Sequence, residues 1–489
     1  MSEFEDRLAA SLSRAIPGCG KLLSARRLSG GASQETYRVE IETSGGPRSL
    51  AVRRAAAGIG VDGDGPGLAG EAELFRIARA AGVPEPEVLH VFSPEEGLGE
   101  GFVMEWLEGE TVGGRILRAP ELAEVRPRLA FQCGEILARI HGIDPGASGI
   151  AGRLKTISTE AYVNEVWERY RSFGTAMPMI DYTARWLLAH LPEEVEPRLV
   201  HNDFRNGNLM VTPDGVVAVL DWELAHLGDP VRDLGWICTN SWRYGRHELP
   251  VGGFGRREDL LAGYESVSGI RVDPMHVRFW EVFGSFWWGV TSLAMAVFWR
   301  AGADRTVERP GIARRSSECQ VDCANLIIPG PVEPVEEQAP ASSVDLPRTD
   351  ELLTSVRDFL RDEARPALEG RNAFLALVAS NSVDIVQREL TLGPAHRRGE
   401  HQRLKALFGS DELLEPLRER LCRGLWDGSI PLDRPGLAHH LRTTAVHQLA
   451  IDQPRYSGLA VALGADRPSQ APGSSSTLST PSRREAKSS

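Results

Sequence analysis

The feature that most constrains this chain is the segment 199–221. In it, three side chains with oxygen atoms, those of Asp203, Asn208 and Asp221, flank a predicted β-hairpin. Two short β-rich runs flank the turn Pro213-Asp214-Gly215, which is a hairpin signal. Folding back brings Asn208, which enters the first strand, beside Asp221, which leaves the second. Asp203 lies on the loop that leads into the hairpin. Two carboxylates and an amide oxygen at one place suit Mg²⁺, with one carboxylate left to act as a base.

This ordered set resembles the catalytic core of the protein-kinase-like superfamily, in which a loop Asp, an Asn five residues later and an Asp after a hairpin carry out phosphoryl transfer. The aminoglycoside phosphotransferase/choline kinase branch is more similar, because Asp221 is followed by Trp222 and Glu223 rather than by Phe-Gly. The segment 227–234, Leu-Gly-Asp-Pro-Val-Arg-Asp-Leu, also resembles that branch. The whole string 199–236 is similar to the kinase-like domains found with acyl-CoA dehydrogenases.

The resemblance implies an α+β, bilobal protein-kinase-like fold that uses ATP and Mg²⁺. Asp203 is then the catalytic residue that accepts or orients the proton of an attacking hydroxyl. Asn208 and Asp221 are the implied metal ligands, holding Mg²⁺ that bridges the ATP phosphates. We expect His201 to support the loop through its ring hydrogen bonds rather than to act as a base.

The strand around residues 51–53 stands where the superfamily places a phosphate-contacting lysine, but here the residue is Arg53. Arginine keeps the charge and offers a bidentate fork, although it does not replace lysine in every contact. We expect Arg53 to contact the α/β-phosphates and to pair with Glu71, with Glu73 as the alternative partner. Arg54 should face the opposite side of the strand and be exposed. A register shift of one residue would exchange the two arginines.

Two backbone segments complete the expected nucleotide site. The loop 29–34 lacks a full GxGxxG motif, but Gly30, Gly31 and Ser33 would let backbone N–H groups approach phosphate. Glu105 and Leu107, at the end of a predicted strand, would offer backbone groups to the adenine edge. A buried strand end is equally compatible with that second segment.

Other polar residues near the hairpin are open to more than one interpretation. Gly228-Asp229-Pro230 favours a helix start capped by Asp229, and we expect Asp229 and Asp233 to be structural rather than extra metal ligands. The candidates for the acceptor side are Glu223, His226, Trp242, Arg243, Tyr244 and Arg246.

Pattern changes along the chain predict two folded units. The order of predicted strands and helices in the first unit resembles the small lobe and then the large lobe of a kinase-like fold. The second unit resembles a small helical domain of unknown function that accompanies such kinases in bacteria. The predicted divisions are a kinase-like phosphotransferase domain at 1–327 (small lobe about 20–108, large lobe about 109–327), a proline-rich linker at 328–348, a separate all-α domain at 349–463 and a Ser/Pro-rich disordered tail at 464–489.

Bulk properties exclude some classes of function. A net charge of −12 gives no electrostatic support for nucleic-acid binding. The six cysteines show no disulfide or zinc framework, which favours a reducing cytoplasm. The run 282–299 has no charged residue over 18 positions. Its aromatic and small polar residues favour a buried helix over the alternative, a membrane span, so we expect no membrane association.

These observations predict an ATP- and Mg-dependent phosphotransferase that phosphorylates a hydroxyl group of a small molecule. Analogy with the acyl-CoA dehydrogenase-linked domains suggests a hydroxyacyl-CoA acceptor and partners in that pathway. The alternatives are an aminoglycoside- or choline-like acceptor, or a nucleotide-binding pseudokinase with a docking domain. A cationic acceptor predicts acidic residues at the site and a CoA thioester predicts basic ones. Four arginines favour the latter slightly: Arg243, Arg246, Arg256 and Arg257.

Overall fold

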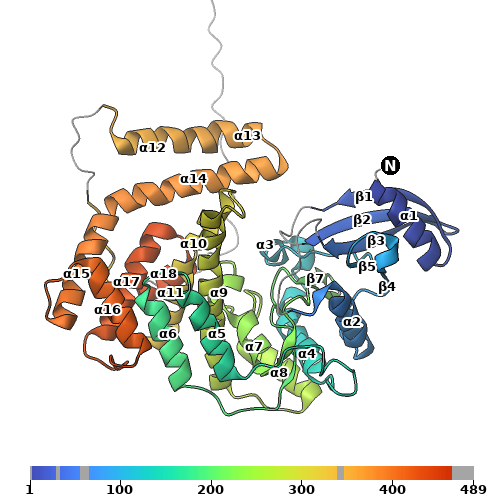
Figure 1. Ribbon diagram of the computed structural model, residues 1–489, viewed down its shortest axis with the longest axis horizontal. Coiled ribbons are helices and arrows are strands. Elements are labelled where there is room, and N and C mark those ends of the chain that lie inside the picture. Colours follow the sequence, from blue (N-terminus) through green and yellow to red (C-terminus); the bar gives the residue numbers. More distant parts are fainter. Residues whose placement is uncertain (1–2, 29–33, 56–64, 339–345, 465–489) are drawn as a thin grey trace, which may run out of the picture.

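The chain folds into a small β-rich lobe, a large helical lobe and an all-helical C-terminal region (Figure 1). The computed structural model describes residues 3–28, 34–55, 65–338 and 346–464. The predicted fold class is confirmed. The division into units at 327 and 349 stays a prediction.

The small lobe is built on one antiparallel sheet of five strands. In pairing order they are β1 (Cys19–Arg27), β2 (Gln34–Thr43), β3 (Gly46–Ala55), β5 (Gly101–Glu105) and β4 (Val88–Val91). Helix α1 (Glu3–Ala15) covers one face and contributes Leu8 and Leu12 to a core with Val52 of β3. Helix α2 (Gly67–Ala80) lies against the other face, where Phe75 packs near Phe102.

The two-residue period of β3 decides which of its arginines reaches the site. Val52 packs under α1, so Ala51 and Arg53 point to the α2 face and Arg54 returns to the α1 face. Arg54 was expected to be exposed, and this is wrong. Its guanidinium bonds Glu35 at 2.9 Å and lies 4.4 Å from the Phe4 ring centroid, because α1 covers that face.

The large lobe is mostly helical, with two short β-pairs that carry the predicted catalytic segment. Strand β6 (Arg198–Val200) pairs with β9 (His226–Gly228), and β7 (Leu209–Thr212) forms the predicted hairpin with β8 (Gly215–Val219). The helices are α3 (Gly113–Ile116), α4 (Leu129–His141), α5 (Thr159–Arg171), α6 (Pro178–Ala189), α7 (Val231–Cys238), α8 (Arg257–Ser268), α9 (Pro274–Ala301), α10 (Glu308–Arg314) and α11 (Ser316–Ile327).

Helix α9 contains the uncharged run and is the central helix of this lobe (Figure 1). Its length and composition would allow it to cross a membrane, and 56% of its most apolar window is buried inside the protein. It packs against α5, α6, α7, α10 and α11. The helix is therefore a core element of the large lobe, in agreement with the interpretation that we favoured.

The C-terminal region adds seven α-helices and a π-helical segment at Phe359–Ala364 in the part of the chain that the structure describes. The α-helices are α12 (Thr349–Asp358), α13 (Arg365–Ala367), α14 (Gly370–Thr391), α15 (Gly393–Phe408), α16 (Leu414–Trp426), α17 (Leu437–Asp452) and α18 (Ser457–Ala462). Helix α17 packs on α11, and α16 packs on α6. Buried residues of both parts, such as Val321 and Leu441, belong to one continuous hydrophobic core.

The described part of the proline-rich segment lies on this joint core. Ile328 and Val332 are buried, and the Val332 amide donates to the Ala462 carbonyl at 3.0 Å. Arg442 of α17 donates to the Ile328 carbonyl at 3.0 Å. The beginning of the predicted linker is therefore held in place by α17 and α18.

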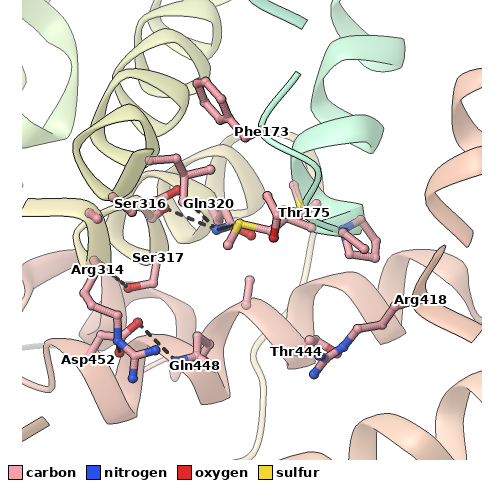
Figure 2. A pocket seen from close by; sticks show the side chains of 18 of the residues that line it. Phe173, Thr175, Arg314, Ser316, Ser317, Gln320, Arg418, Thr444, Gln448 and Asp452 are labelled. Atoms are coloured by element: carbon pink, nitrogen blue, oxygen red, sulfur yellow. Dashed lines mark hydrogen bonds and ion pairs between the residues drawn. The ribbon is translucent and has the colours of Figure 1, made fainter. Parts of the chain in front are cut away.

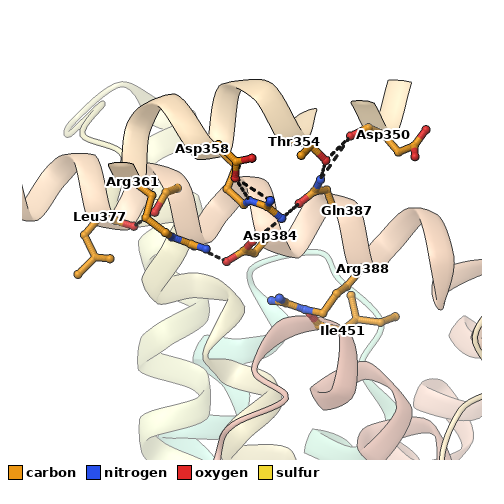
Figure 3. A network of polar contacts seen from close by, with 11 residues as sticks. Asp350, Thr354, Asp358, Arg361, Leu377, Asp384, Gln387, Arg388 and Ile451 are labelled. Carbon is orange, nitrogen blue, oxygen red and sulfur yellow. Dashed lines mark hydrogen bonds and ion pairs between the residues drawn. The ribbon is translucent and has the colours of Figure 1, made fainter. Parts of the chain in front are cut away.

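Helices α12 and α14 run side by side and are joined largely by polar contacts (Figure 3). Arg361 donates to Asp384 at 2.7 Å, and Gln387 donates to the Thr354 hydroxyl at 2.7 Å. Several apolar residues of α12 are exposed, including Leu352 and Val356. This pair of helices thus contributes little to the core.

A buried carboxylate lies where α11 meets the C-terminal region. Asp322 accepts hydrogen bonds from Asn240 at 2.7 Å and from the Tyr456 hydroxyl at 2.6 Å. Burial raises the pKa of Asp322 to about 7, against the lowering effect of these two donors. The protonated form is therefore favoured in the folded protein below about pH 7.

Asp322 should make stability depend on pH. The folded protein holds this proton up to about pH 7, whereas the unfolded chain loses it near its ordinary pKa of about 3.9. Stability should therefore fall by about 1.4 kcal/mol per pH unit between these values as pH rises. Asp322→Asn mimics the protonated acid, so its melting temperature relative to wild type should rise from pH 5 to pH 8. A constant difference across this range would contradict the expectation.

The crossing of α4 and α8 should tolerate no added side-chain atom. A Cβ on Gly134 would lie 2.0 Å from the Leu260 carbonyl oxygen. We expect Gly134→Ala to lower the free energy of unfolding by about 1–3 kcal/mol through overpacking. Gly311→Ala in α10 is the control, since a Cβ at Gly311 would meet only Val378, at 3.6 Å. That change should raise stability by about 0.5–1 kcal/mol, as measured by denaturant unfolding followed through tryptophan fluorescence.

Candidate active site

The loop between β6 and β7 is held from behind by a carboxylate of α7. Asp233 accepts hydrogen bonds from the backbone amides of His201 at 2.8 Å and Asn202 at 2.7 Å. It also contacts His141 Nε2 at 3.2 Å. Burial alone would raise the pKa of Asp233, but the His141 hydrogen bond and charge lower it below the usual range. Asp233 is thus a structural anchor.

Asp229 is also structural, as expected. It accepts from the Val231 amide at 2.9 Å and so caps the start of α7. Its second oxygen contacts His276 Nε2 at 2.6 Å and accepts from Trp280 Nε1 at 2.9 Å. The carboxylate oxygens of Asp229 and Asp233 are both used by donors inside the lobe. These two residues are therefore structural rather than extra metal ligands, as expected.

His201 is buried behind the loop in an apolar setting. Burial lowers the pKa of its imidazole, and the Trp222 ring centroid lies 4.5 Å away. His201 Nδ1 accepts a hydrogen bond from the Asp203 amide at 3.2 Å. Trp222 in turn donates from Nε1 to Glu85 at 3.1 Å, and burial raises the pKa of Glu85 well above its usual range. These contacts support the loop-supporting role expected of His201.

The Asp203 carboxylate receives three donors. Trp236 Nε1 and Arg205 Nε both donate to Oδ1 at 2.9 Å, and Asn208 Nδ2 donates to Oδ2 at 2.6 Å. The preceding residue, Asn202, has a left-handed backbone with φ of 67°, a conformation that asparagine accepts more easily than most residues. The Asp203 side chain is 13% exposed, so it remains within reach of a ligand.

Asn208 and Asp221 meet at the open end of the hairpin, as the hairpin signal predicted. The Leu220 amide donates to the Asn208 carbonyl at 2.8 Å, and Asp221 follows directly. Asp221 has φ of 73°, which turns the chain sharply at this point. Since Asn208 uses its amide nitrogen on Asp203, its side-chain oxygen is left for another partner.

Arg53 joins the small lobe to this end of the hairpin. Its guanidinium lies 3.2 Å from Glu71 and 2.6 Å from Asp221, and its Nε also donates to Gln34. Burial would lower the pKa of Arg53, but Glu71 and Asp221 raise it. Burial raises the pKa of Glu71 to about 7, against the effect of Arg53.

The predicted pair of Arg53 with Glu71 is therefore present. Glu73, the alternative partner, instead lies 3.9 Å from Arg76 on the surface of α2. Glu223 lies 4.0 Å from Arg53 and is 44% exposed, and burial together with Asp221 raises its pKa.

The remaining nucleotide-site predictions concern backbone segments. Glu105 ends β5, and its N–H is used in a bond to the Glu87 carbonyl at 2.9 Å. Of the backbone groups predicted to contact adenine, the Glu105 carbonyl and the N–H and carbonyl of Leu107 therefore remain as candidates. Gly30, Gly31 and Ser33 lie outside the described residues.

The acceptor-side candidates are divided by the structure. Arg243 and Arg257 both pair with the buried Glu281, Arg243 at 2.5 Å, so their charges are neutralised internally. The charge argument for a CoA thioester therefore loses two of its four arginines. His226 is buried, and burial lowers its pKa to about 4, so it is neutral; its place on the substrate side stays a prediction.

An aromatic cluster lies next to Asp203, and of its members only Trp242 was expected near the site from the sequence. Trp236 of α7 lies 5.1 Å from Trp242 and 5.3 Å from Trp287 of α9, measured between ring centroids. The Arg205 guanidinium lies 4.3 Å from the Trp242 centroid. No spacing rule in the sequence connects these tryptophans to Asp203, because they come together only when α7 and α9 pack.

Comparison with known proteins agrees with this arrangement. The sequence model of the family "Phosphotransferase enzyme family" matches residues 24–270, and that of a domain of unknown function (DUF6285) matches residues 366–456. A Ralstonia eutropha protein assigned to the aminoglycoside phosphotransferases has a similar fold. Its TM-score is 0.52 at 21% identity, covering 64% of this chain and 95% of that one.

Curated relatives belong to a group of longer proteins. Acyl-CoA dehydrogenase family member 10 of Mus musculus is 31% identical over 219 residues, 42% of this chain and 19% of that protein. Family member 11 of Rattus norvegicus is 29% identical over 335 residues, 60% of this chain and 40% of that protein. The chain thus spans well under half the length of these relatives. Since the family match covers half of the chain and includes the hairpin, the chain belongs to the phosphotransferase enzyme family.

Proposed function

We propose that the protein is an ATP- and Mg²⁺-dependent phosphotransferase that phosphorylates a hydroxyl group of a small molecule. The observation that carries this proposal is the convergence of Asp203, Asn208 and Asp221 at the end of the hairpin, with Arg53 reaching it from the small lobe. The reaction converts ATP and an alcohol into ADP, a phosphate monoester and a proton.

Asp203 is suited to receive the proton of the acceptor hydroxyl. A carboxylate offers about four acceptor positions, and Trp236, Arg205 and Asn208 use three of those on Asp203. The three donors hold the carboxylate in one orientation and leave a position for the hydroxyl. A positioned base of this kind contributes typically about 10²–10⁴-fold to the rate.

The residues at the hairpin end fit a magnesium site. The free side-chain oxygen of Asn208 and the Asp221 carboxylate are hard oxygen ligands of the type Mg²⁺ prefers. When bound, Mg²⁺ would neutralise charge on the ATP phosphates. Arg53 now contacts Asp221, and a guanidinium at this position can also bind phosphate oxygens in a bidentate manner.

The acceptor that we propose is a hydroxyacyl-CoA. The observation that supports it is that the names of the relatives refer to acyl-CoA dehydrogenases. The Arg205 guanidinium that lies over Trp242 is paired with the Asp203 carboxylate, so its charge does not decide between acceptors. The six cysteines are free, which supports a reducing compartment such as the cytoplasm for this activity.

Replacing the proposed base should abolish turnover. We expect Asp203→Asn to lower kcat by about 10²–10⁴-fold, because the amide cannot accept the hydroxyl proton. The matched control is Asp214→Asn in the exposed turn of the same hairpin, which should keep wild-type activity. ADP release is measured with Mg²⁺ and, in turn, a 3-hydroxyacyl-CoA, choline and an aminoglycoside. Wild-type protein that binds ATP but turns over none of these acceptors would instead indicate the pseudokinase.

Nucleotide binding can be tested by comparing substitutions of Arg53 and Arg54, which are neighbours in β3 but lie on opposite faces of the sheet. Arg53→Met should raise the KM for ATP at least tenfold, because it removes the cation at the phosphate end of the site. It also leaves Glu71 buried without its partner, so this carboxyl should take up a proton. Arg54→Met changes the opposite face of β3 and should leave the KM for ATP unchanged. Equal effects of the two substitutions would contradict the proposed role of Arg53.

A further inference from the structure

A cavity of about 450 Å³ lies where the C-terminal helices meet the large lobe (Figure 2). One wall comes from the segment between α5 and α6, one from the end of α9 with α10 and α11, and one from α15, α16 and α17. None of the residues that surround Asp203 lines it. Its volume is in the range typical of small-molecule sites, about 300–1,000 Å³. Because both parts of the chain form the walls, the cavity depends on the docking of the C-terminal helices.

The side contributed by the large lobe is mainly apolar. Phe173 and Met177 come from the segment between α5 and α6, and Leu293, Val297 and Trp299 come from α9. Phe173 lies at the edge of the cavity in Figure 2. Two aromatic side chains and a methionine form a surface that suits a flat or branched apolar body.

The opposite side contains two buried histidines, each with at least one ring nitrogen that has no hydrogen-bond partner among the described residues. His440 of α17 is 1% exposed, and neither of its ring nitrogens has a partner among the residues that the structure describes. His396 of α15 is 3% exposed, and its Nδ1 likewise lacks a described partner. A buried polar group without a partner costs about 1–3 kcal/mol, so two such groups on one cavity wall require an explanation.

Both imidazoles are neutral in the folded protein. Burial lowers the pKa of His440 to about 4 and that of His396 to about 3. A neutral imidazole offers one N–H donor and one nitrogen acceptor. Such a ring matches an uncharged group that both donates and accepts, such as a hydroxyl, better than it matches a carboxylate or an ammonium.

Both carboxylates of the cavity wall are already paired with arginines. Arg418 makes a two-pronged contact with Glu400, including one bond of 2.6 Å. Arg314 lies 2.9 Å from Asp452, which also accepts from Gln448 at 3.1 Å (Figure 2). Each carboxylate is therefore balanced by an arginine, whereas both ring nitrogens of His440 and Nδ1 of His396 have no hydrogen-bond partner among the described residues.

We propose that this cavity is a binding site for a small molecule with an apolar, aromatic body and one uncharged hydrogen-bonding group such as a hydroxyl. The apolar body lies against the α9 side, and the hydroxyl exchanges hydrogen bonds with His440 and His396. The site is separate from Asp203, and its occupancy does not require phosphoryl transfer.

Three matched naphthyl probes test this proposal on the full chain: 2-naphthol, naphthalene and 2-naphthoate. They share the apolar body, but 2-naphthol carries a hydroxyl, naphthalene carries no polar group and 2-naphthoate carries a carboxylate. Binding is measured by equilibrium dialysis with fluorescence detection. We expect saturable binding of 2-naphthol at least tenfold tighter than that of either other probe. A tighter affinity for 2-naphthoate, or no saturable binding of any probe, would overturn the proposal.

Two substitutions on α9 test whether 2-naphthol binds inside the cavity. Ala296 lines the cavity, whereas Ala301, on the same helix, does not. Ala296→Trp should weaken 2-naphthol binding at least tenfold by filling the space, and Ala301→Trp should leave it unchanged. Equal binding to both variants would show that the probe binds elsewhere.

A histidine variant separates a binding role from a purely structural one. His440→Leu removes the unpaired polar atoms at similar volume, so the melting temperature without ligand should be equal to or above that of wild type. The same variant should bind 2-naphthol no better than naphthalene. A lower melting temperature, or an unchanged preference for 2-naphthol, would show that His440 does not serve a ligand.

Discussion

The geometry of the candidate site depends on one buried guanidinium, that of Arg53. It draws Glu71 of the small lobe and Asp221 of the large lobe to the same point. Charges taken out of water are tolerated only when they are paired, and removing one partner of such a pair typically costs about 3–5 kcal/mol. The contact therefore fixes the position at which the sheet of the small lobe faces the hairpin. A single residue on β3 can do this because strand alternation places it on the face that α2 covers.

The loop that carries Asp203 shows how local strain is offset by tertiary contacts. Asn202 and Asp221 both adopt left-handed backbones, a conformation that costs most residues about 1–2 kcal/mol and that Asn and Asp accept more easily. Asp233 opposes this cost by accepting two backbone amides of the loop, and hydrogen bonds to a charged group are among the stronger ones in proteins. The result is a carboxylate, Asp203, held by donors from three separate positions in the sequence.

Helix α9 connects the candidate site around Asp203 with the cavity at the C-terminal helices. Trp287, near its middle, touches Trp236, which donates to Asp203. Its last turns line the cavity beneath the C-terminal helices. The uncharged, aromatic character that made this segment resemble a membrane span is explained by this position, since tryptophans and phenylalanines pack on several sides of it. The same apolar helix thus packs against both the candidate site and the C-terminal helices.

Local signals in the sequence were enough to determine the hairpin, the order of elements and the all-helical C-terminal region. The Pro-Asp-Gly turn and the spacing of Asp203, Asn208 and Asp221 act over a few residues, and period-2 alternation placed Arg53 opposite Arg54. Only the tertiary structure showed that α1 covers Arg54, that Glu281 neutralises Arg243 and Arg257, and that Trp236 holds Asp203. It alone placed His440 on a cavity wall. These contacts join residues far apart in the chain, and no local pattern specifies which helix faces will meet when the lobes pack.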